Sequence, residues 1–102
     1  MKKLLTATIL AVSLTSWAQS KTDERCSELA EFSQTVMEAR QRGIEMQRLV
    51  QLSQGNELAI RIIIEAYDVP RYRTSEYHQN AITEFVIKIQ ITCYKALIKK
   101  TS

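Results

Sequence analysis

Cys26 and Cys93 are the thiols of this sequence and His78 is its imidazole, the side chains most often used as nucleophile and as general base at neutral pH. His78 is the single histidine, and its spacing pairs it with no serine. A cysteine–histidine nucleophile would need a free thiol. The chain also lacks H-E-x-x-H, G-x-S-x-G and a glycine-rich phosphate loop. The sequence therefore predicts no enzymatic activity, no metal site and no cofactor.

The two cysteines favour a structural disulfide. They form neither the C-x-x-C of redox exchange nor part of a Cys/His cluster for zinc. A bridge from Cys26 to Cys93 would close a long loop, for which the chain-entropy estimate is about 4 kcal/mol. Such a bridge requires an oxidising compartment. The bridge can therefore form only if the chain is exported from the cytoplasm.

The first eighteen residues read as a secretory signal peptide. Lys2 and Lys3 precede an apolar run, Leu4 to Trp17, and Ser16 and Ala18 are the small residues that a signal peptidase inspects. The run is shorter than the roughly 18 residues of a spanning helix, so no stable membrane anchor is expected after processing. We predict a signal peptide at 1–18, with cleavage after Ser20 as the alternative, a single helical domain at 19–102, and a periplasmic or secreted protein.

Removal of this leader changes the charge balance. The chain has 14 Lys and Arg against 11 Asp and Glu, and losing Lys2 and Lys3 leaves 12 basic residues. Nucleic-acid binding requires a basic patch well in excess of this balance. We therefore expect no nucleic-acid partner.

The helical pattern is interrupted at Gly43, Gly55 and Pro70. The four helical segments that result are 23–42, 44–54, 56–67 and 74–99. We predict an all-α fold, a small bundle of three long helices and a short one, with the disulfide joining the first and last helices side by side and antiparallel. The third segment is apolar nearly all round and is expected at the centre of the domain. Its β-branched run could instead form a buried strand, but no second strand-like segment is present to pair with it.

The last segment carries two apolar rows. The row expected to face the core is Ile82, Phe85, Val86, Ile89, Cys93 and Leu97. The second row is Ile87, Ile91, Tyr94 and Ile98, which we call the outer row. It could form a partner surface or a homodimer seam. Coverage by the second or third helix is the interpretation that we favour at this point.

The connection from Tyr67 to Arg73 has the most distinctive local chemistry. In one interpretation it is a pinned loop, with Asp68 in a salt bridge to a nearby arginine and a packed tyrosine. In the other it is a recognition tip, because Tyr and Arg dominate protein interfaces. The residues of that tip are Arg71, Tyr72, Arg73 and Tyr77.

A wider set of residues carries a resemblance. The set is Cys26, Leu29-Ala30, Val36-Met37, Arg40-Gln41-Arg42-Gly43, Met46, Ile62-Ile63, Ala66-Tyr67, Pro70-Arg71-Tyr72, Phe85 and Cys93. In these positions the chain resembles a group of small exported helical proteins of Gram-negative bacteria and their prophages. The resemblance covers nearly all of the mature chain. It implies export and a helical fold, and it implies no activity.

We therefore expect a non-enzymatic protein-interaction module, immunity-like or inhibitor-like, whose partner is another protein in the periplasm. One alternative is a periplasmic stress chaperone, suggested by the small size, the helical content and the core held by a disulfide. A further alternative is a hydrolase acting on the cell envelope, which would need carboxylates that converge on a pocket.

Overall fold

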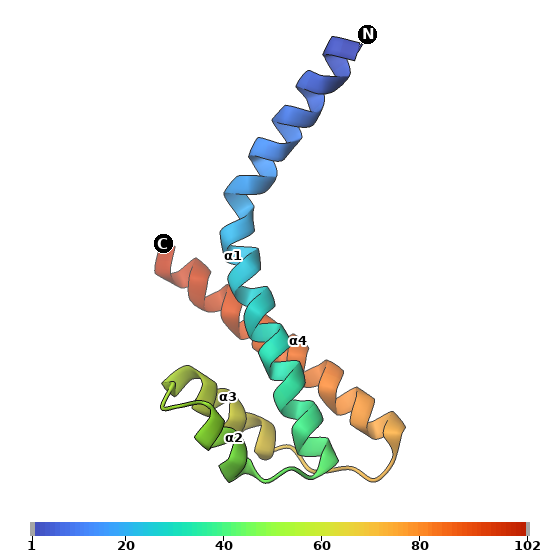
Figure 1. Cartoon of the computed structure of the whole chain (residues 1–102), viewed down its shortest axis with the longest axis vertical. Coiled ribbons are helices and arrows are strands. Elements are labelled where there is room, and N and C mark those ends of the chain that lie inside the picture. Colours follow the sequence, from blue (N-terminus) through green and yellow to red (C-terminus); the bar gives the residue numbers. More distant parts are fainter. Residues whose placement is uncertain (1, 102) are drawn as a thin grey trace.

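The computed structural model is all-α, as predicted (Figure 1). The helices are α1 (Lys2–Arg42), α2 (Met46–Leu52), α3 (Glu57–Tyr67) and α4 (Ser75–Thr101). The structure describes the backbone of residues 2–101 and the side chains of residues 21–99, and that backbone contains no strand. The predicted signal peptide, residues 1–18, lies outside the residues whose side chains are described. No helix in the part searched is long and apolar enough to cross a membrane.

Local chemistry explains where the helices begin and end. Gly43 has a φ of 87°, the left-handed conformation that favours glycine after a helix. Asn56 precedes α3, and its Oδ1 accepts a hydrogen bond from the backbone N–H of Ala59 at 3.0 Å, as an N-cap does. Gln54 and Gly55 also have positive φ, so α2 ends at Leu52. The predicted breakers therefore stand at the observed junctions.

The first and last helices are joined by the predicted disulfide. The Cα atoms of Cys26 and Cys93 lie 5.6 Å apart. Figure 1 shows α4 crossing α1, with its carboxyl-terminal half beside the part of α1 that contains Cys26. The chain directions of the two helices are opposed, so the antiparallel arrangement expected from the sequence is confirmed.

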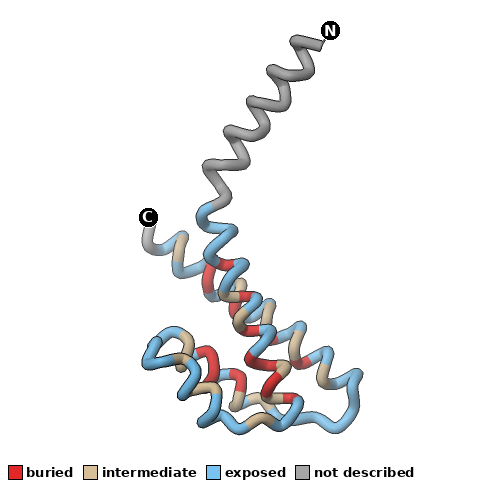
Figure 2. The backbone as a smooth tube through the Cα atoms, in the orientation of Figure 1, coloured by how far each residue is buried: buried red, intermediate tan, exposed pale blue. Residues whose placement is uncertain are grey.

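The core lies where α1, α3 and α4 meet (Figure 2). Its members are Val36 and Met37 of α1, Ile62, Ile63 and Ala66 of α3, and Ala81, Phe85 and Ile89 of α4. Because burial of large side chains is the main favourable term in folding, this three-helix contact holds the domain together.

One expectation about α3 is wrong. Ile62 and Ile63 are buried, but Leu58 is 53% exposed and Ile64 is 47% exposed, so α3 is not enclosed on all sides. Leu58 lies on the side of α3 that faces a groove shared with α1 and α4. α2 has only seven residues, and none of them is buried.

Candidate protein-binding surfaces

The loop between α3 and α4 is fixed to the end of α1 by four side chains. We call this set the clasp: Arg40, Gln41, Tyr67 and Arg71. Gln41 is 1% exposed and forms its centre. Its Nε2 donates to the carbonyl of Pro70 at 2.9 Å, and its Oε1 accepts from the backbone N–H of Tyr72 at 2.8 Å. The buried amide of Gln41 thus pairs with one acceptor and one donor of the loop backbone, the Pro70 carbonyl and the Tyr72 N–H.

Arg40 and Tyr67 extend the clasp. The Arg40 Nε donates to the carbonyl of Val69 at 2.9 Å, and its guanidinium lies 5.0 Å from the centre of the Tyr67 ring. The Tyr67 hydroxyl donates to the carbonyl of Ile44 at 2.6 Å. The chain that follows α1 and the chain that follows α3 are therefore fastened at the same place.

Arg71 is held by the end of α1. Its Nε donates to the carbonyl of Gln41 at 2.9 Å, and its Nη2 donates to that of Arg42 at 3.3 Å. A cation at the carboxyl end of a helix is favourable because the last carbonyls lack partners. A Cβ on Gly43 would lie 2.9 Å from the Arg71 Cζ, so the glycine is needed for this contact as well as for its φ. Arg71 thus anchors the loop, although part of the residue remains exposed.

The salt bridge expected for Asp68 is not formed. Among residues 21–99 the ion pair joins Lys88 of α4 to Glu65 of α3 at 3.7 Å, between exposed side chains. The loop is pinned as predicted, but by hydrogen bonds of Arg40 and Gln41 with its backbone and of its own Arg71 with the α1 backbone. Those donors and acceptors lie about thirty positions away in the sequence and could not be paired by local spacing.

Tyr67 gives the clasp a pH dependence that can be measured. Partial burial raises the pKa of its phenol, with a smaller opposing effect of Arg40. The hydroxyl must be protonated to donate to Ile44, so its contribution to stability is complete below about pH 10 and is lost as the pH rises through the raised pKa. In urea titrations, wild type is expected to exceed Tyr67→Phe by about 1 kcal/mol at about pH 8. The difference should disappear towards about pH 12. A pH-independent difference would contradict this role.

The clasp leaves a rigid, exposed set of residues, which we call the tip: Tyr72, Arg73 and Tyr77. Tyr72 is 38% exposed and Tyr77 is 56% exposed, and their ring centres lie 5.8 Å apart. The Thr74 hydroxyl accepts from the N–H of Tyr77 at 3.3 Å at the start of α4. The His78 ring contacts the carbonyl of Tyr72. All four residues predicted for a recognition tip are thus exposed, and one of them, Arg71, also fixes the loop to α1.

The outer row of α4 is open to solvent, so the coverage that we favoured from the sequence is wrong. The exposed fractions are 48% for Ile87, 50% for Ile91, 36% for Tyr94 and 66% for Ile98. The Tyr94 hydroxyl donates to Oδ1 of Asp23 on α1 at 2.9 Å. This hydrogen bond is the main reason that the pKa of Tyr94 is raised, with smaller effects of burial and of the Asp23 charge. The row faces away from the core because α2 and α3 lie on the other side of α4.

An apolar groove between α1, α3 and α4 was not expected from the sequence. Its volume is about 670 Å³. The apolar residues along it are Leu29, Leu58, Ile62, Ile89, Ala96 and Leu97, and the charged ones are Arg25, Glu28, Arg61 and Glu65. The groove is lined by residues of three helices that are far apart in the sequence, so it depends on packing rather than on any motif.

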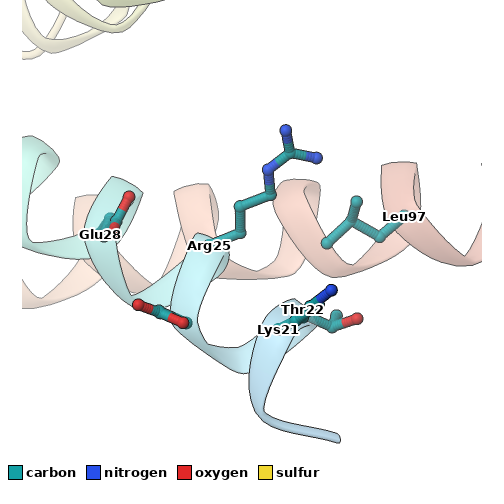
Figure 3. A pocket seen from close by; sticks show the side chains of 6 residues that line it. Lys21, Thr22, Arg25, Glu28 and Leu97 are labelled. Atoms are coloured by element: carbon teal, nitrogen blue, oxygen red, sulfur yellow. The ribbon is translucent and has the colours of Figure 1, made fainter. Parts of the chain in front are cut away.

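A smaller cavity of about 280 Å³ lies between the α1 surface and Leu97 of α4 (Figure 3). Glu24 and Glu28 line it with Lys21 and Arg25. Figure 3 shows Arg25 and Glu28 on α1 and Leu97 on the neighbouring helix. Among the described residues, no group of three or more His, Cys, Asp or Glu could hold a metal ion. The two carboxylates that line the cavity, Glu24 and Glu28, are exposed and lie one helical turn apart on α1.

Comparison with known proteins finds no matching protein family, no matching curated protein and no matching solved structure. The resemblance to small exported helical proteins therefore stays a prediction.

Proposed function

We propose that this protein is a non-enzymatic binding module, immunity-like or inhibitor-like, that contacts another protein through the tip. The observation that carries the proposal is the pair of exposed rings, Tyr72 and Tyr77, on a loop that the clasp holds in place. Tyrosine and arginine are the residue types that most often dominate binding energy. Tyr72, Arg73 and Tyr77 supply both types on one small surface.

The clasp supports this proposal energetically. Ordering a loop on binding costs free energy, and a loop already fixed in the free protein avoids most of that cost. Gln41 and Arg71 make this loop rigid before any partner arrives. A rigid aromatic tip is therefore a better binding element than a flexible loop of the same sequence.

The proposed compartment is the periplasm or the exterior of the cell. The disulfide supports an oxidising, extracytoplasmic compartment. Residues 1–18 favour export, because a charged start followed by a short apolar run is typical of a signal peptide. Within the oxidising compartments, the periplasm is our proposal.

A stress chaperone is the second candidate, and the apolar groove is the observation that favours it. Acid activation would require carboxylates whose protonation loosens the fold. In residues 21–99 every carboxylate is exposed apart from the half-buried Glu38. Protonation of these groups at low pH would therefore change the packing of the core little. The binding module is therefore the better supported proposal. A hydrolase is the least supported, because the carboxylates that line the cavity and the groove, Glu24, Glu28 and Glu65, are all exposed on helix surfaces.

The test is affinity capture from a periplasmic extract with matched variants. We expect a single partner to be retained by wild type and by Leu52→Ala, which removes an exposed apolar side chain of α2. The double variant Tyr72→Ala/Tyr77→Ala should bind that partner at least about tenfold more weakly. If the partner is an enzyme or toxin, its own activity should fall when wild type is added. Equal retention by the double variant would refute the proposal, as would the absence of a specific partner.

A further inference from the structure

We propose that the outer row of α4 pairs with the outer row of a second copy of this chain, with the two α4 helices parallel and in register. The row lies at the opposite end of α4 from the tip residue Tyr77, so this association would leave the tip free. The spacing of the row and the charges on its two flanks favour a second copy of this chain as the binding partner.

The spacing is that of a two-stranded helical seam. Ile87, Ile91, Tyr94 and Ile98 are separated by four, three and four residues, the alternation of the d and a positions of a heptad. Isoleucine at the a positions 91 and 98 is found in two-stranded coiled coils, whereas isoleucine at the d position 87 is also found in higher oligomers. The four side chains lie on one continuous helix, α4, and all are exposed. A seam of this kind is self-complementary, as a two-fold dimer requires.

The charges on the flanks select the orientation. In this heptad Lys88 and Lys95 occupy e positions on one flank of the row. Asp23 lies on the other flank, where it accepts the hydrogen bond of Tyr94. Lys88 is paired with Glu65 inside the same chain, whereas Lys95 forms no ion pair among the described residues.

A parallel pair brings the e flank of each helix against the opposite flank of the other, so Lys95 of one copy would approach Asp23 of the second copy. An antiparallel pair brings the two e flanks together and places Lys95 near Lys88. Like charges facing each other across an interface are unfavourable. The parallel arrangement therefore buries the apolar row and also brings opposite charges together on its flanks.

The size of the row sets the strength of the association. A stable interface usually buries about 800 Å² on each partner. Four side chains with exposed fractions of 36% to 66% supply only part of that area. We therefore expect a weak dimer, with a dissociation constant in the micromolar range.

Sedimentation equilibrium of the purified, oxidised protein tests the seam. Wild type should change from monomer to dimer as its concentration rises. Ile91→Lys should weaken the dimer at least about tenfold, because it places a charge in the apolar seam. Leu52→Lys makes the same change at an exposed apolar residue of α2 and should leave the dimer unchanged. Circular dichroism of each variant confirms that its helices are intact.

Charge reversal tests the orientation. For the parallel arrangement, Lys95→Asp and Asp23→Lys should each weaken the dimer about fivefold, and the double variant should restore it. For an antiparallel pair, Lys95→Asp would strengthen the dimer because it removes the repulsion from Lys88. A protein that stays monomeric at every concentration would overturn the proposal. A Lys95→Asp variant that dimerises more tightly than wild type would overturn it as well.

Discussion

Replacing Cys26 with serine is expected to lower the free energy of unfolding by about 4 kcal/mol. The bridge joins residues 67 positions apart, so it removes a large amount of conformational freedom from the unfolded chain. The total stability of a domain is typically about 5–15 kcal/mol. A domain of this size buries only about 60–65% of its unfolded surface, so it has little other stability in reserve. Much of the Cys26→Ser population should therefore be unfolded at physiological temperature.

Urea denaturation monitored by circular dichroism measures this effect. Cys93→Ser should be destabilised by a similar amount, and the double variant Cys26→Ser/Cys93→Ser should be no worse than either single variant, since all three lose the same bridge. Wild type with its disulfide reduced serves as the chemical control. A loss below about 1 kcal/mol in every case would mean that the helices hold together without the bridge.

Replacing Gln41 with leucine is expected to cost about 2–4 kcal/mol, because leucine has a similar size but no polar atoms. The Pro70 carbonyl and the Tyr72 N–H would lose their partner in a largely buried position. Leaving a buried polar group unpaired costs about 1–3 kcal/mol. The substitution also leaves Arg71 and the other clasp residues in place, so the loss isolates the central amide.

Gln34→Leu is the matched control, since Gln34 is an exposed glutamine of the same helix. It should change the free energy of unfolding by less than about 0.5 kcal/mol. Hydrogen exchange at the Tyr72 amide gives a second measurement. That amide should exchange much faster in Gln41→Leu than in wild type, because its acceptor has gone. Unchanged exchange at Tyr72 would contradict the central place of Gln41 in the clasp.

The sequence predicts the helices because their signals are local. Gly43 supplies a positive φ, Asn56 caps α3 and Pro70 prevents continuation, and each acts within a few residues. The pairing of Cys26 with Cys93 needs no geometry, since the chain has two cysteines. These features were confirmed.

The clasp and the exposure of the surfaces depend on long-range packing. Gln41 and Arg71 meet only after α1 and α3 have packed, and nothing in the local sequence distinguishes Gln41 from the exposed Gln34. The clasp residues do recur among the positions that carry the resemblance, in the runs Arg40 to Gly43 and Pro70 to Tyr72. The openness of the outer row and of the groove depends on how α1, α3 and α4 pack, because the row lies on the side of α4 away from the core and residues of all three helices line the groove.

Site-specific photo-crosslinking in the exporting cell tests the proposed function most directly. A photoreactive amino acid replaces Tyr77 at the tip in one variant and the exposed Leu52 of α2 in another. We expect one discrete adduct with another protein from position 77 and none from position 52. No adduct at position 77, or the same adduct from both positions, would contradict the claim that the tip is a protein-binding surface.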